Sequence, residues 1–236
     1  MTELLLETAT DVCSVAVARD GKVLAEVTAG EVHQHASHLT VFIGEALARA
    51  GVEMEQLDGL LLSDGPGSYT SLRVGAATAK GLCLALPQLT LAVVPTLTAL
   101  AAAARPETEE RVMATINSRR GEVFGQLFDA VTLTPLTEVM NVHLEDPQWR
   151  GKLLAGEGLG RILVCGPGQG RVADATAHDD AFSFAAPKRC SASYLLAPAR
   201  RRPELAAYEP FYLNAPFVTQ SKKRTLGWAV SATYSS

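Results

Sequence analysis

The feature that most constrains the fold of this chain is the segment Ser63–Leu86, which reads SDGPGSYTSLRVGAATAKGLCLAL. The apolar run Leu60–Leu62 before it predicts a buried strand. Gly65-Pro66-Gly67 then predicts a turn, because glycine tolerates unusual backbone angles and proline fixes its own φ. A helix follows, and Ser68 or Thr70 could cap it. This geometry is typical of phosphate sites, but no Gly-Lys-Ser/Thr follows, so the segment is not a Walker A loop.

The helix predicted over Thr70–Leu86 has an almost bare surface. Two glycines inside a helix cost roughly 1 kcal/mol each relative to alanine. Small side chains let two helices approach closely, which offsets such a cost. We therefore expect another helix to pack closely against it. The small residues are Gly75, Ala76, Ala77, Ala79, Gly81 and Ala85.

Composition limits the class of protein. The 236 residues carry a formal net charge of −4, which argues against unaided nucleic-acid binding over the whole surface. Hydrophobic residues make up 47% of the chain and charged residues 19%, so we expect a partner to cover part of the surface. The longest apolar stretch, Leu91–Ala104, contains Pro95 and is shorter than the ~20 residues that span a membrane.

Targeting and cysteine signals point to the cytoplasm. The N-terminal sequence has no basic region before its short apolar run, so a secretory signal is not expected. The four cysteines form no CxxC pair, which favours buried free thiols over zinc or redox chemistry. They are Cys13, Cys83, Cys165 and Cys190.

The order of elements predicts mixed sheets flanked by helices. Three strands with a tight turn at Asp20-Gly21 form a meander, and an amphipathic helix over Ala36–Ala50 ends at Gly51. The first half is expected to contain strands over 3–7, 12–18, 23–27, 59–63 and 89–94 and a further helix over 96–104. The second half is expected to contain strands over 112–116, 122–128, 136–142 and 162–165 and a helix over 191–199.

The polar, proline-containing segment Arg105-Pro106-Glu107 predicts a domain boundary. We divide the chain into an N-terminal lobe over 1–106, a C-terminal lobe over 107–220 and a frayed polar tail over 221–236. No long-period repeat is visible.

The end of the first strand, Glu7-Thr8-Ala9-Thr10, is a candidate phosphate loop. In the actin, Hsp70 and sugar-kinase superfamily this place carries Asp-x-Gly-Thr/Ser, where glycine lets the backbone approach a phosphate. Here Ala9 adds a Cβ and Glu7 is longer than aspartate. The segment is therefore either a degenerate phosphate loop or an ordinary strand end.

Other candidate sites have structural alternatives. His33, His35 and His38 lack metal-ligand spacing, and no HExxH motif occurs, so they favour a polar helix entrance. Arg73 and Lys80 lie two turns apart and could clamp a phosphate or lie on a solvated or partner-pairing face. Three basic clusters could touch RNA phosphates or be solvated: Arg119-Arg120, Arg200-Arg201-Arg202 and Lys222-Lys223-Arg224. The run 166–170, GPGQG, lacks dinucleotide-loop spacing and favours a tight strand-to-helix turn.

The glycine-helix segment resembles the hallmark of the TsaB family, once called YeaZ: Gly-Pro-Gly-Ser-Phe-Thr-Gly-Leu-Arg followed by Gly-x-Ala-x-Ala-Lys-Gly-Leu. The run 117–123, NSRRGEV, resembles the family's Asp-Ala-Arg-x-Gly-Glu-Val-Tyr, and 210–213, PFYL, resembles its closing Pro-x-Tyr-Leu. The first strand end and the His-Gln-rich stretch 30–38 also match. Ser71 and Asn117 depart from the family's glycine and aspartate.

The resemblance implies a two-lobed, actin-like (ASKHA) α/β fold. It implies a non-catalytic subunit of the complex that forms threonylcarbamoyladenosine beside the tRNA anticodon. The partners would be the catalytic paralogue TsaD and the ATPase TsaE, with tRNA reached indirectly and a homodimer when the chain is alone. No cofactor, metal or membrane is expected.

We expect the partner to dock on the helices over Ala36–Ala50 and Thr70–Leu86. The alternatives are an actin-like ATPase or kinase that uses Thr8, Thr10 and the Gly65–Gly67 turn, and a metalloprotease, which lacks ligands. The predicted interface positions are Leu39, Phe42, Leu72, Arg73, Ala76, Lys80 and Cys83.

Overall fold

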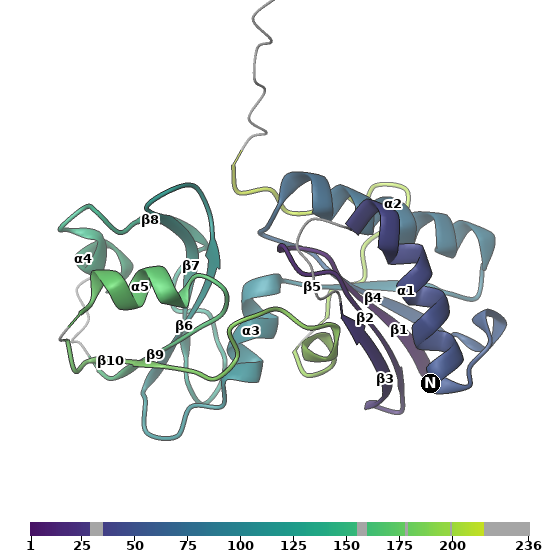
Figure 1. The fold of residues 1–236 in the computed structure, drawn as a ribbon, viewed down its shortest axis with the longest axis horizontal. Coiled ribbons are helices and arrows are strands. Elements are labelled where there is room, and N and C mark those ends of the chain that lie inside the picture. Colours follow the sequence, from purple (N-terminus) through teal and green to yellow (C-terminus); the bar gives the residue numbers. More distant parts are fainter. Residues whose placement is uncertain (29–34, 155–159, 178, 199, 215–236) are drawn as a thin grey trace, which may run out of the picture.

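The computed structural model describes residues 1–28, 35–154, 160–177, 179–198 and 200–214. Two five-stranded sheets lie side by side, with helices around and between them (Figure 1). We call the part built on each sheet the first lobe and the second lobe. This is the mixed-sheet, two-lobed architecture that the sequence predicts.

The first sheet has the strand order β3-β2-β1-β4-β5. β1 pairs antiparallel with β2, and β2 with β3, through a tight turn in which Asp20 and Gly21 both have positive φ. β4 and β5 are parallel to β1. The bounds are β1 (Thr2–Glu7), β2 (Ser14–Arg19), β3 (Lys22–Thr28), β4 (Gly59–Ser63) and β5 (Thr90–Val94).

Helices α1 (His35–Ala50) and α2 (Tyr69–Ala85) cover one face of this sheet (Figure 1). The apolar stripe of α1 is buried there, including Leu39, Ile43 and Leu47, together with Leu4 and Leu6 of β1. Gly51 ends α1 with a positive φ, and Ser68 caps α2. A short 3-10 turn, η1 (Met54–Gln56), lies between α1 and β4.

Helix α3 (Thr96–Ala104) lies between the two sheets. Its Ala99 packs in the cluster that contains Leu5 and Leu61 of the first sheet. Its Leu97 and Leu100 pack in the cluster with β6 and β7 of the second. The core of the molecule is therefore continuous through α3, because both faces of this apolar helix are covered.

The second sheet has the strand order β10-β9-β6-β7-β8. β6, β7 and β8 form an antiparallel meander, and β9 and β10 run parallel to β6. Two short helices, α4 and α5, cover its outer face. The bounds are β6 (Arg111–Asn117), β7 (Glu122–Asp129), β8 (Met140–His143), α4 (Trp149–Leu154), β9 (Ile162–Cys165), α5 (Gln169–Ala175) and β10 (Phe182–Phe184).

The two sheets share one topology, although the sequence shows no visible repeat. In each, a meander of three strands precedes two parallel strands added beyond the first strand of the meander, with a helix before each added strand. Helix α5 begins at the strand-to-helix turn predicted over 166–170, whereas α4 and β10 have no counterpart among the predicted elements, and β8 is shorter than the strand predicted over 136–142.

After the second sheet, the chain returns to the first. Ala192 and Leu195, in the 3-10 helix η2 (Ala192–Leu196), pack against the first sheet. Arg201 forms an antiparallel bridge with Val93, and Tyr208 joins the first core. The prediction of a helix over 191–199 is therefore wrong in type and extent, because only one 3-10 segment forms. The lobe boundary at residue 106 and the tail over 221–236 stay predictions.

Candidate functional site

A cavity of about 580 Å³ opens between the two lobes. Loops at the carboxyl ends of strands in both sheets line it, which is where open α/β folds place ligands. The lining consists of Ala9, Thr10, Asp11, Gly67, Ser68, Tyr69, Ile116, Asn117, Ser118, Arg119, Phe124, Pro167, Arg171, Tyr212, Leu213 and Asn214. The loop after β1 and the turn before α2 thus meet the 117–121 turn at one site.

The loop after β1 uses its own backbone donors internally. The Glu7 carboxylate accepts from the Ala9 N–H (2.7 Å), and the Ser63 hydroxyl accepts from the Thr8 N–H (3.1 Å). Burial raises the pKa of Glu7 from 4.5 to about 7, and the hydrogen bonds from Ala9 and Ser63 limit the rise. These two N–H groups are therefore not available to a phosphate in this arrangement.

The turn before α2 packs directly on that loop. The Ser68 N–H donates to the Ala9 carbonyl (2.7 Å), and a Cβ on Gly67 would lie 2.1 Å from the same oxygen. A Cβ on Gly75 would lie 2.2 Å from the Thr8 hydroxyl oxygen. Both glycines thus permit a close approach of the chain to itself, and Gly75 packs against a loop rather than against another helix.

Gly65 and Pro66, which complete the turn, are buried and join through a cis peptide bond. Gly65 has a φ of 101°, and a Cβ there would lie 2.4 Å from the Phe211 carbonyl. The prediction of a turn that needs glycine is confirmed at this position.

The opposite wall is the turn between β6 and β7. Arg171 of α5 donates to the backbone carbonyls of Arg119 and Glu122, both at 2.6 Å. The Asn117 side chain donates to the Pro167 carbonyl (3.1 Å). Arg171 and Asn117 therefore fix the backbone of the turn, while the side chains of Arg119 and Arg120 remain exposed.

Two tyrosines stand between the lobes at the cavity. The rings of Tyr69 and Tyr212 lie 4.8 Å apart, and the Arg73 guanidinium lies 5.2 Å from the Tyr69 ring centre and donates to its hydroxyl. The Tyr212 hydroxyl and the Ser118 hydroxyl are buried without a hydrogen-bond partner among the described residues. Desolvation raises the pKa of Tyr212.

Most predicted interface positions lie in this chain's own core. Leu39, Leu72, Ala76 and Cys83 are buried, because their side chains face the rest of the first lobe. Phe42 and Lys80 are half-buried, and only Arg73 is exposed. These four side chains thus pack inside the first lobe, which corrects their prediction as partner-interface positions.

The outward faces of the two helices carry different residues. Val41 of α1 is 59% exposed and Leu84 of α2 is 74% exposed. Ala77 and Gly81 are also exposed, and a Cβ on Gly81 would meet nothing within 4 Å. The bare surface predicted for α2 is therefore present. It lies on the side of the helix that carries Ala77 and Gly81, not on the side that carries Ala76.

The cysteines, possible metal-ligand groups and histidines are the next candidates. All four cysteines are buried free thiols, as predicted, and desolvation raises the pKa of Cys13 to about 11. No group of three His, Cys, Asp or Glu residues that could hold a metal occurs among the described residues. His33 and the side chain of His35 lie outside the described residues, and the His38 ring contacts Phe42.

The basic clusters differ in role. Arg200 pairs with Glu3 (2.5 Å) and Arg201 with Asp64 (2.8 Å), so these two residues attach the returning segment to the first lobe. Tyr208 also donates to Asp64 (3.1 Å). Lys222-Lys223-Arg224 lies outside the described residues. The Asp64 contacts were not predicted, because no local sequence pattern links residues so far apart in the chain.

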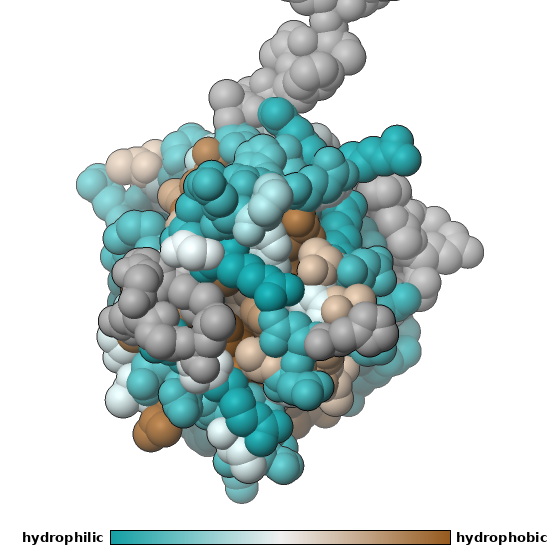
Figure 2. Space-filling view, turned by 90° about the vertical axis from the view of Figure 1, so that its left-hand side faces the viewer, coloured by the Kyte–Doolittle hydropathy of each residue, from teal (hydrophilic) through white to brown (hydrophobic). Residues whose placement is uncertain are grey.

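None of the helices in the described part of the chain has both the length and the apolar character needed to cross a membrane. The end of the molecule formed by the second lobe is mostly hydrophilic, with scattered apolar residues (Figure 2).

The two-lobed arrangement with mixed sheets and an interlobe cavity is an actin-like (ASKHA) α/β fold. A family model described as TsaD, tRNA N6-adenosine threonylcarbamoyltransferase, matches residues 22–139, half of the chain. Two proteins named tRNA threonylcarbamoyladenosine biosynthesis protein TsaB are similar to this chain. The one from Haemophilus influenzae is 37% identical over 127 residues and the one from Escherichia coli 32% over 124.

Each alignment covers 52% of this chain, and the chain spans about half the length of these curated relatives (52% and 53%). The solved structure of YeaZ from Pseudomonas aeruginosa superposes with a TM-score of 0.69 at 26% identity, over 83% of this chain and 88% of that one. A second solved structure, described as a protein with similarity to peptidase YEAZ from Pseudomonas aeruginosa, superposes with a TM-score of 0.73 at 24% identity, over 90% of this chain and 99% of that one. At this level of identity, the likeness shows the fold alone. The chain therefore belongs to the TsaB/YeaZ family.

Proposed function

We propose that this chain is a non-catalytic subunit in the biosynthesis of threonylcarbamoyladenosine in tRNA, where it docks and activates a TsaD-type catalytic subunit. A TsaE-type ATPase would complete the complex, and the chain alone would form a homodimer. The pathway is the one printed in the names of the TsaB relatives. The partner is suggested by the match to the TsaD family model.

The observation that carries the non-catalytic role is the closed loop after β1. Thr8 and Ala9 donate their N–H groups to Ser63 and Glu7. A pKa of about 7 leaves Glu7 partly protonated at neutral pH, which weakens it as a metal ligand. A phosphate and its metal would have to displace both hydrogen bonds before they could bind, which argues against the alternative of an ATPase or kinase.

The outward face of α1 and α2 supports docking of a partner. It combines small residues, Ala77 and Gly81, with the exposed apolar side chains of Val41 and Leu84. Small residues allow a partner's helix to approach closely, and exposed apolar residues gain free energy when a partner covers them. This face would also form the homodimer in the absence of the partner.

The test is capture of the TsaD-type protein of the same cell, followed by an assay of tRNA modification with and without this chain. Ala77→Glu should weaken capture at least tenfold, since ~1.4 kcal/mol is tenfold in affinity, and should keep the melting temperature. Ala76→Glu is the contrast, because Ala76 is only 6% exposed. An unpaired carboxylate there should lower the melting temperature or prevent expression.

Val131→Glu is the matched control. Val131 is 91% exposed in the second lobe, so the variant adds one carboxylate to an exposed apolar position away from the two helices. It should keep both capture and stability. Unchanged capture by Ala77→Glu and Leu84→Glu would contradict docking on this face, and magnesium-dependent ATP turnover that Thr10→Ala abolishes would favour the enzyme alternative.

A further inference from the structure

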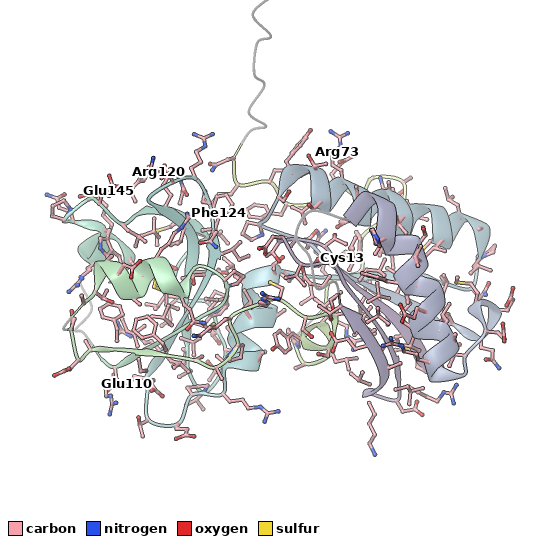
Figure 3. All side chains as sticks on the ribbon, viewed as in Figure 1. Cys13, Arg73, Glu110, Arg120, Phe124 and Glu145 are labelled. Atoms are coloured by element: carbon pink, nitrogen blue, oxygen red, sulfur yellow. The ribbon has the colours of Figure 1, made fainter. Side chains whose placement is uncertain are left out.

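Arginine side chains gather at the mouth of the interlobe cavity. Arg119 and Arg171 line it, and among the described lining residues Asp11 alone is acidic. Arg120 follows Arg119 and, like Arg73, lies outside the cavity lining. Figure 3 shows Arg120 and Arg73 at the same edge of the molecule, one from each lobe, with Glu145 beside Arg120. This mouth is therefore locally basic in a chain whose formal net charge is −4.

The carboxylates near these positive charges are Asp11 in the cavity lining and Glu145, whose carboxylate lies beside Gly121 in the turn that carries Arg119 and Arg120. Arg119 and Arg120 are exposed and make no ion pair within the described part of the chain. Arg171 donates to backbone carbonyls, which carry no formal charge. In contrast, Arg200 and Arg201 each meet a carboxylate. Unpaired arginines at the rim of a cavity attract phosphate groups, to which guanidinium binds well.

Aromatic rings stand between the arginines. Tyr69 and Tyr212 both line the cavity, with their ring centres 4.8 Å apart. The Arg73 guanidinium covers Tyr69 at 5.2 Å. The hydroxyls of Ser118 and Tyr212 are buried in the same lining without a partner among the described residues. Aromatic rings in a basic groove are a surface on which unpaired bases stack. A base that stacks on Tyr69 would take the place of the Arg73 guanidinium or of the Tyr212 ring.

We propose that this arginine–tyrosine mouth binds an RNA strand, with its phosphates on Arg119, Arg120 and Arg73 and an unpaired base at Tyr69 and Tyr212. The inference rests on the proposed function, because it names the part of this chain that contacts the RNA. Phosphate joined to a base is also the chemistry of a free nucleotide. RNA fits better, because the arginines are spread along a rim and the backbone donors of Thr8 and Ala9 are occupied.

The experiment measures binding of a fluorescein-labelled tRNA transcript to the full chain at several salt concentrations. The double variant Arg119→Glu and Arg120→Glu should bind about tenfold more weakly. Loss of two phosphate contacts should also make the slope of log K against log salt shallower by about 1.4, at ~0.7 per contact with a single strand. Tyr69→Ala should weaken binding with no change of that slope.

The matched control is Lys188→Glu and Arg189→Glu, another adjacent basic pair that is exposed and outside the cavity lining. It should leave affinity and slope within twofold of the original chain. Equal loss in both double variants, no tRNA binding by the original chain, or displacement of the tRNA by ATP at equal phosphate concentration would each overturn the RNA site.

Capture of TsaD separates this inference from the proposed function. The Arg119 and Arg120 variant should capture TsaD normally, because both residues lie in the second lobe, away from α1 and α2, and should lower tRNA modification. Normal capture with unchanged tRNA binding rejects the RNA site alone. Absence of TsaD capture by the original chain rejects the proposed function.

Discussion

The two lobes repeat one strand order but differ in what surrounds it. In the first lobe, α1 and α2 have 16 and 17 residues, whereas the helices at the same places in the second lobe, α4 and α5, have 6 and 7. A long helix offers an outward face along its whole length, while a helix of two turns covers little more than its own sheet. The proposed partner surface therefore lies on the first lobe, whereas both lobes contribute turns to the cavity.

The turns at equivalent strands sharpen the contrast. Gly-Pro-Gly follows both β4 and β9, and Gly65 and Gly166 both have positive φ. The preceding residue differs: Asp64 holds the returning segment, whereas Cys165 is a buried thiol. The last residue of the first strand differs as well, because Glu7 is buried and Asn117 is exposed. The turns over 65–67 and 166–168 thus share a sequence but have neighbours that make different contacts.

The largest effect is expected from the third residue of each turn. Gly67→Ala should lower the free energy of unfolding by about 3 kcal/mol, the upper end for overpacking, because its Cβ would lie 2.1 Å from the backbone oxygen of Ala9. Gly168→Ala should cost only about 1 kcal/mol, since its nearest neighbours are the side-chain atoms of Thr115 at 3.0 Å. Urea unfolding of both variants measures the difference.

Gly170→Ala is the control for these substitutions. A Cβ there would meet nothing within 4 Å, so alanine should stabilise α5 by up to about 1 kcal/mol. Equal losses for Gly67→Ala and Gly168→Ala would show that the two turns are packed alike.

The second prediction uses the buried carboxyl of Glu7. Its pKa is about 7 in the folded chain and 4.5 as the reference value. The folded state therefore holds more protons than the unfolded state between these values, and stability falls as pH rises from about 4.5 to 7. Glu7→Gln removes this loss, so the variant should gain up to about 3 kcal/mol over the original chain at pH 8, since one pKa unit is ~1.4 kcal/mol.

Thermal unfolding at pH 5, 6, 7 and 8 would measure the widening gap between the two proteins. Asn117→Ala, at the equivalent place in the second lobe, should show a difference that does not change with pH. Parallel curves for Glu7→Gln and the original chain would mean that Glu7 titrates normally.

The third prediction concerns the residue before each turn. Asp64→Ala should cost about 2 kcal/mol, because it leaves the buried Tyr208 hydroxyl without its acceptor. The Arg201 pair adds little, since that side chain is largely exposed. Trypsin should cut after Arg200–Arg202 faster in the variant. Cys165→Ala should cost about 1 kcal/mol and leave that cleavage unchanged; faster cleavage in both would contradict separate tasks.

The sequence predicted local features well where the signal is local. The strand over 59–63, the helix over 96–104 and the strand over 162–165 match the structure, because continuous apolar runs and flanking turn residues mark their ends. The turn over 166–170 predicted the start of α5 but not its extent, and α4 was not predicted, because six or seven residues hold too few turns for a helical pattern. The shared topology of the lobes also escaped, since it depends on strand pairing and not on residue identity.

The candidate site was predictable in part for the same reason. Residues 7–10 and 65–67 were singled out by their types and residues 117–123 by their resemblance to a family motif, and the structure brings these segments to one cavity or beside it. The side of α2 that faces the core was not predictable, because Ala76 and Ala77 are chemically identical. Burial of Ala76 follows from packing on the first sheet, which only the tertiary structure provides.

The smallest effect is expected at the start of α2. Ser68 is the N-cap, and its hydroxyl oxygen accepts from the Ser71 hydroxyl (3.0 Å) and, more weakly, from the Ser71 N–H (3.5 Å). Ser68→Ala should therefore cost about 0.5–1 kcal/mol in urea unfolding. Thr70→Ala should cost nothing or stabilise slightly, because Thr70 is exposed inside the first turn and alanine is the better helix former.

This small effect tests whether α2 and α5 are held at their first turns in different ways. Helix α5 has Gly168 at its N-cap and no side-chain cap, and its first turn is held by packing and by hydrogen bonds from the Gln169 and Arg171 side chains to neighbouring backbone carbonyls. If Ser68→Ala leaves stability unchanged, the cap does not hold the start of α2, and the two lobes do not differ in how their helices begin. If Thr70→Ala costs as much as Ser68→Ala, Thr70 contributes to the cap, which its exposed position in the structure does not support.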